Sequence, residues 1–270
     1  MNISWLNPNT LIDIIETASQ LILQIYLGCD FVIETKDDNS PLTIADKKAN
    51  EYICSNLRTY YPTIPIISEE IKNEPYDIRK NYTFAWIIDP LDGTKEFIKK
   101  NGEFTVNIGL IHNGIPVAGF VNIPVKGLTY WAIEGQGAFI KEINKDTHTS
   151  INEIRNKHKS RKTRVLASRS HMNKETESFI EKLGDVELMN VGSSIKILWI
   201  AENTADIYPR LSPCMEWDTC AAHAILREVG GLLLEYKDNE LRDDLRYNKE
   251  SLYNPNYVCY GPNFINYKLK

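Results

Sequence analysis

The sequence predicts two halves of different class, an α+β half followed by an α/β half. Three observations support this prediction. Expected helices precede a meander of strands in the first half, strands and helices alternate in the second, and a polar stretch separates the two. The chain has 270 residues, enough for one large core or two fused ones. We expect halves of 1–150 and 151–270.

The first half begins with two expected helices. Apolar residues recur at helical spacing over 11–25, which predicts an amphipathic helix. Thr10 is its expected N-cap and Gly28 its stop. A second helix is expected over about 44–57, and a short strand over 64–68.

The strands of the first half follow from apolar runs and turn signals. Residues 85–88 are a short apolar strand, and 104–110 alternate apolar with polar or small residues, which predicts a half-buried strand. Asn113-Gly114 then predicts a hairpin, with 117–123 as the returning strand. A further hairpin is expected over 130–140.

The stretch 141–164 is polar and basic, and we interpret it as a solvated connector. The alternative is a basic patch for nucleic acid. The second half then predicts a strand over 165–167, helices over about 174–183 and 193–202, and a last long helix after Trp217.

The overall composition excludes several classes of protein. The net charge is -5, which argues against binding of polymeric nucleic acid. The five cysteines form no C-x-x-C pair, so neither a zinc site nor a disulfide framework is indicated. The N-terminus does not resemble a signal peptide, and no apolar run approaches the ~20 residues of a membrane span. We therefore expect a cytoplasmic protein without an integral membrane segment.

Four carboxylates fall at the ends of expected elements, namely Glu69, Asp89, Asp92 and Asp218. A single acidic residue is usually just solvated, and Asp218 alone is most simply a helix N-cap. Asp89 and Asp92, however, are embedded in an apolar segment, where carboxylates are normally paired or bound to metal. Oxygen ligands without His or Cys suit Mg²⁺, and the Leu91 carbonyl can face the same point. A second ion could share a bridging carboxylate.

Three motifs give a resemblance to a known family. The chain reads ISEE at 67–70, WIIDPLDGTKEF at 86–97 and EWDTCAAHAIL at 216–226. Together, in this order and spacing, they resemble the inositol monophosphatase superfamily over nearly the whole chain. Cys220 and Ala222 stand where relatives often have Ala and Gly. The resemblance implies a layered α-β-α-β-α sandwich of the inositol monophosphatase and sugar phosphatase type, with the site between the halves.

Within that superfamily the chain is most similar to bacterial 3'(2'),5'-bisphosphate nucleotidases of the CysQ type. Lys95-Glu96-Phe97 stands where inositol phosphatases carry Thr-Asn-Phe, and segments 36–46, 101–107, 167–171, 192–196 and 208–210 point the same way. The resemblance implies a lithium-sensitive, Mg²⁺-dependent enzyme of sulfur metabolism. It would hydrolyse the 3'-phosphate of 3'-phosphoadenosine 5'-phosphate. An inositol or sugar phosphatase with the same metal site, or a catalytically silent phosphate-binding protein, remain alternatives.

The resemblance also implies roles for single residues. Glu69, Asp89, the Leu91 carbonyl, Asp92 and Asp218 match ligands of two or three Mg²⁺ ions. Asp46 and Thr94 match a pair that orients and deprotonates the attacking water, although Asp46 alone is most simply a helix cap. The residues expected to contact the substrate are Glu69, Leu91, Asp92, Gly93, Thr94, His171, Gly192, Ser193, Ser194, Lys196, Arg210 and Asp218.

Of these, Lys196 and Arg210 are expected to hold a second phosphate, and His171 an adenosine. The expected partner is a small phosphorylated nucleotide. A homodimer and peripheral association with the inner membrane are open alternatives.

Overall fold

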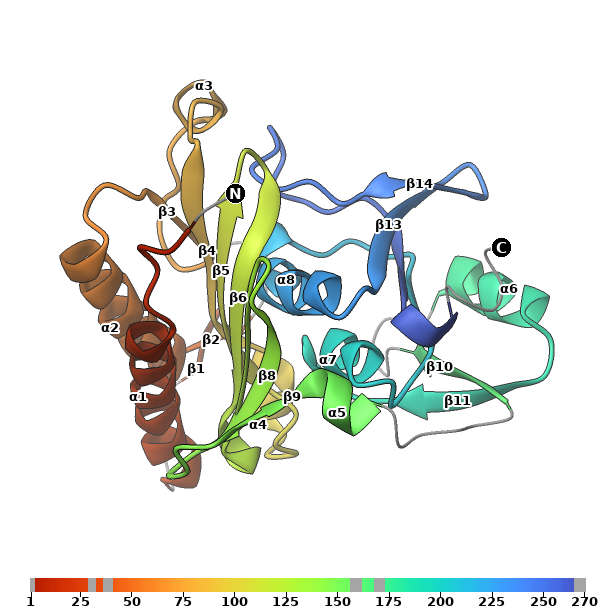
Figure 1. Ribbon diagram of the computed structural model, residues 1–270, viewed down its shortest axis with the longest axis horizontal. Helices are drawn as coiled ribbons and strands as arrows, with labels where there is room; N and C mark the ends of the chain where they lie inside the picture. The colour runs from red at the N-terminus through yellow and green to blue at the C-terminus, as the bar shows by residue number, and fades with distance from the viewer. Residues whose placement is uncertain (1–2, 29–32, 36–40, 156–161, 168–172, 265–270) are drawn as a thin grey trace.

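The computed structural model describes residues 3–28, 33–35, 41–155, 162–167 and 173–264. Figure 1 shows five layers. Helices α1 and α2 cover one face of a seven-stranded sheet, and α7 and α8 cover its other face. A six-stranded sheet lies beyond α7 and α8, and α6 is outermost. This is the α-β-α-β-α sandwich that the family resemblance implies, and that expectation is confirmed.

The described helices comprise eight α-helices and two 3-10 turns. They are α1 (Pro8–Leu27), α2 (Ile44–Tyr60), α3 (Tyr76–Arg79), α4 (Thr94–Ile98), η1 (Pro124–Lys126), α5 (Ile151–Arg155), α6 (Lys174–Lys182), α7 (Ile195–Ala201), η2 (Glu216–Asp218) and α8 (Cys220–Glu228).

The seven-stranded sheet follows the order of the chain and is antiparallel except for the pair β3–β4. Its strands are β3 (Ile66–Ser68), β4 (Phe84–Asp92), β5 (Thr105–His112), β6 (Ile115–Ile123), β7 (Leu128–Ile133), β8 (Gly137–Glu142) and β9 (His148–Ser150). A small separate pair is formed by β1 (Ile33–Thr35) and β2 (Pro41–Thr43).

The six-stranded sheet is mixed, in the order β11-β10-β12-β15-β13-β14. Its strands are β10 (Thr163–Ala167), β11 (Val186–Asn190), β12 (Ile207–Arg210), β13 (Leu232–Lys237), β14 (Glu240–Asp244) and β15 (Tyr257–Tyr260). One hydrophobic cluster contains residues of both sheets, for example Ile87 and Cys259. The halves therefore share a core.

Helix α1 shows how the N-terminus is fixed. It begins at Pro8, and the Asn7 side chain accepts a hydrogen bond from Asn9 N at 3.0 Å. The expected N-cap at Thr10 is therefore wrong, because proline is well suited to the first helical position, where its missing N–H costs nothing. The expected stop at Gly28 is confirmed.

The expectation that no segment approaches a membrane span is also too strong. Among the described residues, α1 is long and apolar enough to cross a membrane. Its apolar face, which includes Leu11, Ile15 and Ile22, is nevertheless fully buried in the core of the protein. Helices α1 and α2 pack side by side. The composition of α1 is thus accounted for by this packing.

Strand β5 differs from the half-buried strand that its alternating pattern predicts. Every residue from Thr105 to Ile111 is buried, because α1 covers one face and α8 the other. The hairpin at Asn113-Gly114 is confirmed: their φ angles are 48° and 76°, values that favour these two residue types.

The connector at 141–164 is more structured than predicted. Strand β9 pairs with β8 and so extends the sheet by one strand. His148 Nδ1 lies 3.0 Å from Trp131 Nε1, and Ile151 is fully buried. A polar composition did not reveal this, because an edge strand needs few apolar residues. Residues 156–161 lie outside the described part of the chain.

Helix α8 lies unusually close to the seven-stranded sheet. Gly109 on β5 and Gly119 on β6 face each other in register beneath the helix. A Cβ atom at Gly119 would lie 2.0 Å from the Ala221 carbonyl oxygen, and one at Gly109 would lie 2.7 Å from Cys220 Sγ. The helix therefore packs directly against the strand backbone at these two glycines, where no side chain intervenes.

This close packing also places the turn η2, which precedes α8 and ends at Asp218. The expectation that Asp218 begins the last helix is wrong, because Asp218 is the last residue of the preceding 3-10 turn. Its side chain accepts a hydrogen bond from Met215 N at 2.9 Å and so caps η2, whereas α8 begins at Cys220.

Replacement of Gly119 by alanine tests this packing. We expect Gly119→Ala to lower the free energy of unfolding by about 3 kcal/mol, because a backbone carbonyl cannot move aside as a side chain can. Urea denaturation measures the change. Gly28→Ala is the matched control, since Gly28 is exposed with φ -68°, and it should stay within about 1 kcal/mol of the parent protein. A Gly119→Ala protein as stable as the control would contradict the close contact.

Candidate metal and phosphate site

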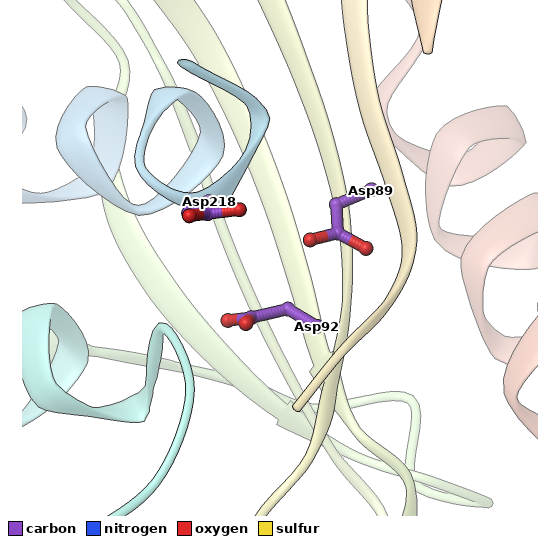
Figure 2. Close-up of side chains that lie close together, drawn as sticks. All are labelled: Asp89, Asp92 and Asp218. Atoms are coloured by element: carbon purple, nitrogen blue, oxygen red, sulfur yellow. The ribbon is translucent and has the colours of Figure 1, made fainter. Parts of the chain in front are cut away.

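Three aspartates from distant parts of the sequence meet between the two halves. Asp89 lies within β4, Asp92 ends that strand, and Asp218 ends η2. One carboxylate oxygen from each lies within 4.8 Å of the others. Figure 2 shows the three side chains directed toward a common space. Asp89 is buried and the other two are partly buried.

The end of β4 explains why Asp89 and Asp92 face the same point. The pairing with β5 is irregular between these residues. Leu91 N donates a hydrogen bond to Asp89 Oδ1 at 3.0 Å, which closes a local turn. Gly93 follows with a φ of 92°, a conformation that favours glycine. The proline-containing turn thus redirects the chain and places both carboxylates on one side.

A hydrogen-bonded network fixes the orientation of Asp92. Its Oδ2 accepts from Ser194 N at 2.5 Å and lies 3.5 Å from Thr105 Oγ1. The Ser194 hydroxyl lies 2.8 Å from Thr105 Oγ1 and donates to Asn107 Oδ1 at 2.9 Å. Sequence reasoning gave Thr105 and Asn107 no role of their own, because they occupy ordinary alternating positions of a strand.

Glu69 follows β3 and lies beside this group. Its N–H donates to the Ile88 carbonyl at 3.2 Å. Among the described residues, Glu69 is not part of the set whose oxygens all lie within 4.8 Å. Its charge nevertheless contributes to raising the pKa of Asp89, Asp92 and Asp218.

The electrostatics of the group favour binding of a cation. Burial, followed by the charges of Glu69, Asp92 and Asp218, raises the pKa of Asp89 well above its ordinary value. Burial and the charges of Asp92 and Glu69 raise the pKa of Asp218 to about 8. Burial raises the pKa of Asp92 to about 6, although the Lys196 ammonium opposes this. Several carboxylates close together in a buried place are stabilised by a bound cation.

The chemistry of the donors indicates which cation fits. All of the acidic ligand atoms are oxygens, and the group contains neither His nor Cys. The Leu91 carbonyl oxygen lies at the same turn, 3.3 Å from Thr94 Oγ1. Such a donor set suits a hard divalent cation rather than zinc.

Asp46 combines a structural contact with a position near the site. It is the third residue of α2, and its Oδ2 accepts hydrogen bonds from Thr43 N at 2.7 Å and Thr43 Oγ1 at 2.6 Å. The N-cap of α2 is therefore Thr43 and not Asp46, which is its reciprocal partner at the third helical position in a capping box. The other oxygen, Oδ1, lies 3.4 Å from Thr94 Oγ1. Asp46 thus bonds to Thr43 with one carboxylate oxygen and faces Thr94 with the other.

Two cations from the second half border the carboxylates. Lys196 is 7% exposed, so it is not the surface charge that a lone lysine usually is. Burial lowers its pKa to about 8, against the opposing effect of Asp92. The Arg210 Nη2 donates to the Pro213 carbonyl at 3.1 Å, and its buried Nε has no hydrogen-bond partner among the described residues. Arg210 is close enough to lower the pKa of both Lys196 and Asp218.

The loop before α7 packs against the segment after β4. Gly192 N donates to Glu103 Oε2 at 2.9 Å, and a Cβ atom on Gly192 would lie 2.7 Å from the Glu103 carbonyl oxygen. Ser193 has a positive φ of 49°, and Ser194 is buried in the Asp92 network. The N–H groups of Gly192 and Ser194 are therefore already hydrogen-bonded within the protein. His171 lies outside the described residues.

Comparison with known proteins assigns the chain to a family. The chain matches the Inositol monophosphatase family over residues 9–262. It belongs to that family.

Individual relatives are similar over nearly their full length. The 3'(2'),5'-bisphosphate nucleotidase CysQ of Escherichia coli K12 is 38% identical over 242 residues, which cover 89% of this chain and 94% of the relative. The crystal structure of CysQ from Bacteroides thetaiotaomicron has a TM-score of 0.79 and 42% identity, covering 94% of this chain and 97% of the other. The suhB protein of Bartonella henselae shares the fold, with a TM-score of 0.74, 21% identity and coverage of 97% and 95%.

The raised pKa values predict how stability depends on pH and on a divalent cation. Without metal, the folded protein keeps a proton on Asp218 up to a pH of about 8, whereas the unfolded chain loses it near its ordinary pKa of 3.8. The free energy of unfolding should therefore fall as pH rises from 5 to 8, by on the order of 1 kcal/mol per pH unit. MgCl₂ should reverse this fall, because the ionised carboxylates bind the cation.

Urea denaturation at pH 5, 6.5 and 8, with EDTA or with MgCl₂, measures both effects. Asp218→Asn is the control, because it removes one of the three titrating carboxylates and should reduce both the pH slope and the response to MgCl₂. The electrostatic account would be contradicted if, without metal, the free energy of unfolding of the parent protein changed no more between pH 5 and pH 8 than that of Asp218→Asn.

Proposed function

We propose that the protein is a magnesium-dependent phosphatase that hydrolyses the 3'-phosphate of 3'-phosphoadenosine 5'-phosphate to give AMP and phosphate. The observation that carries the proposal is the meeting of Asp89, Asp92 and Asp218 beside Thr94, with Lys196 at the edge of the group. Relatives that are 38% identical over 94% of their length are 3'(2'),5'-bisphosphate nucleotidases, which supports this substrate.

The proposed metal ligands are Glu69, Asp89, the Leu91 carbonyl, Asp92 and Asp218, which would hold two or three Mg²⁺ ions. Bound Mg²⁺ would supply positive charge to the phosphoryl oxygens and would acidify a water molecule. All of these ligands except Asp218 come from the N-terminal half, 1–150. Asp218 comes from the C-terminal half, 151–270. We propose this division because the seven-stranded sheet ends at Ser150 and the six-stranded sheet begins at Thr163.

Asp46 and Thr94 are proposed to hold and deprotonate the attacking water. A water next to Thr94 Oγ1 can give its proton to that oxygen while the hydroxyl gives its own to Asp46 Oδ1, 3.4 Å away. The two hydrogen bonds from Thr43 hold Asp46 Oδ2 and so fix the direction of Oδ1. A base held within hydrogen-bond reach in this way needs little rearrangement during the reaction.

Lys196 and Arg210 are proposed to bind the 5'-phosphate. An arginine offers a planar fork suited to phosphate, and the buried Nε of Arg210 lacks a partner among the described residues. The other proposed substrate contacts near the reacting phosphate are Gly93, Thr94, Gly192, Ser193 and Ser194, and the proposed adenosine contact is His171. A monophosphate would leave Lys196 and Arg210 without a phosphate to bind, which favours a bisphosphate substrate.

The other proposed properties follow from the substrate. A small phosphorylated nucleotide is a soluble metabolite, and we propose a cytoplasmic enzyme of sulfur metabolism that is inhibited by Li⁺. We propose no partner in the form of polymeric nucleic acid, because the net charge is -5. A homodimer and peripheral contact with the inner membrane remain proposals of the same kind.

A comparison of substrates tests the proposed function. We expect kcat/KM to be at least 100-fold higher for 3'-phosphoadenosine 5'-phosphate than for inositol 1-phosphate, with activity lost in EDTA and restored by MgCl₂. Phosphate release measures both. Higher kcat/KM for inositol 1-phosphate or for a sugar phosphate would favour the alternative phosphatase, and no turnover of any substrate with Mg²⁺ would favour a silent phosphate-binding protein.

The Lys196→Met variant tests the site for the second phosphate. The variant keeps most of the buried volume but removes the charge. We expect KM for 3'-phosphoadenosine 5'-phosphate to rise about tenfold or more, with a smaller change for 3'-AMP, which lacks the 5'-phosphate. Lys99→Met, at an exposed lysine after α4, is the control. Equal changes in KM for the two substrates would remove Lys196 from this role.

A further inference from the structure

A buried arginine connects the two halves at a distance from the aspartates. Arg79, at the end of α3, is 4% exposed. Its Nε donates to the Glu74 carbonyl at 2.8 Å, within its own half. Its other nitrogens cross to the second half, where Nη1 donates to Asn248 Oδ1 at 2.6 Å and to the Lys249 carbonyl at 3.1 Å. Nη2 donates to the Glu250 carbonyl at 3.2 Å.

The contact between Arg79 and Asn248 is reciprocal. Asn248 Nδ2 donates to the Arg79 carbonyl at 2.7 Å, so the two residues exchange hydrogen bonds in both directions. The arginine fork is planar and rigid, and a pairing of this kind fixes distance as well as direction.

A buried carboxylate holds the same segment, 248–250, from its other side. Glu216, the first residue of η2, is fully buried. It accepts hydrogen bonds from Asn248 N at 2.5 Å and from Lys249 N at 3.1 Å, and it pairs with the Lys249 ammonium. Carbonyl groups of the segment therefore face the cation and N–H groups face the anion. We call Arg79, Asn248 and Glu216 the Arg79 clamp.

Each side of the Arg79 clamp is connected to a proposed metal ligand through a short segment of chain. Glu216 is two residues from Asp218 on the short turn η2. On the other side, Arg79 holds Glu74, at the end of the loop that begins at Glu69. Hydrogen bonds between Ser68 and Asn73 join the two ends of that loop.

The closure comes from Asn73 and Ser68, which bond to each other twice. Asn73 Nδ2 donates to the Ser68 carbonyl at 3.0 Å, and Ser68 N donates to Asn73 Oδ1 at 3.1 Å. A loop closed in this way moves as a unit, so a displacement of the Glu74 backbone would also displace Glu69.

We infer that the Arg79 clamp sets the separation between Glu69 and Asp218 and thereby the affinity for Mg²⁺. The inference rests on the proposed function, since it takes both residues as metal ligands. No member of the clamp is a proposed ligand or substrate contact, so its members are positioning residues. Outer partners of metal ligands commonly change metal affinity by 10–100-fold.

The competing explanation is that the clamp stabilises the fold and nothing more. A merely structural role would lower the melting temperature and leave Mg²⁺ affinity unchanged well below it. The Mg²⁺ dissociation constant therefore separates the two explanations, and calorimetric titration with MgCl₂ measures it without any substrate.

Asn248→Gly is the decisive variant. Asn248 has a positive φ of 58°, so glycine accepts the backbone conformation while the side-chain contacts to Arg79 are lost. Asn144→Gly is the matched control, because Asn144 has a φ of 66° in an exposed turn far along the chain from the clamp. We expect Asn248→Gly to raise the Mg²⁺ dissociation constant about tenfold and Asn144→Gly to leave it within twofold.

Activity gives a second, independent reading. At saturating MgCl₂ the kcat of Asn248→Gly should return close to that of the parent protein, because the ligands themselves are intact. Arg79→Lys, which keeps the charge but not the fork, should weaken Mg²⁺ binding in the same direction. Should Arg79→Lys fail to fold, Asn248→Gly alone decides.

The outcomes distinguish this inference from the proposed function. A parent protein that binds no Mg²⁺ in the titration would overturn the proposed metal site. A parent protein that binds Mg²⁺ with the same affinity as Asn248→Gly would leave the proposed function intact and overturn the role of the Arg79 clamp.

Discussion

The close contact between α8 and the backbone of the seven-stranded sheet is the constraint on which the site depends. Glycines at positions 109 and 119 lie in register beneath the helix, and neither could carry a Cβ without a clash. Because α8 lies this close, the turn η2 before it reaches the end of β4, and Asp218 meets Asp89 and Asp92. The two halves share a hydrophobic core for the same reason. Assembly of the acidic group is therefore a consequence of packing between the halves.

The same group works against the stability of the metal-free fold. Burial and mutual repulsion raise the pKa values of all three aspartates. Carboxylates that must lose their protons in such a place destabilise the protein, unless a cation is bound. Hydrogen bonds from Ser194 and Met215 hold Asp92 and Asp218 in place despite this repulsion. An arrangement that is costly alone and stabilised by a cation is expected of a site maintained for binding and chemistry rather than for folding.

Local sequence patterns predicted much of the fold, and contacts distant in sequence account for the rest. The hairpin at Asn113-Gly114 and the helices α1, α2, α6, α7 and α8 were predicted from neighbouring residues, and so was the proximity of Asp89 to Asp92, whereas the short helices α3, α4 and α5 were not predicted. The full burial of β5 could not be predicted, because α8, which covers it, lies more than a hundred residues further along the chain. The place of Asp218 followed from a family resemblance rather than from spacing. Arg79 and Asn248, 169 residues apart, gave no signal in the sequence.

Asp46 shows why structural and functional interpretations of one residue need not compete. A carboxylate has two oxygens, and here they have different partners: Oδ2 accepts from Thr43 in the capping box, and Oδ1 faces Thr94. The local interpretation took Asp46 as the N-cap of α2, whereas Asp46 is the third helical residue and caps the helix together with Thr43, in a capping box of four adjacent residues. The capping contact then orients the second oxygen, which is the condition that a positioned base requires. A contact that begins a helix can thus also direct a catalytic group, and the sequence pattern for the first role does not argue against the second.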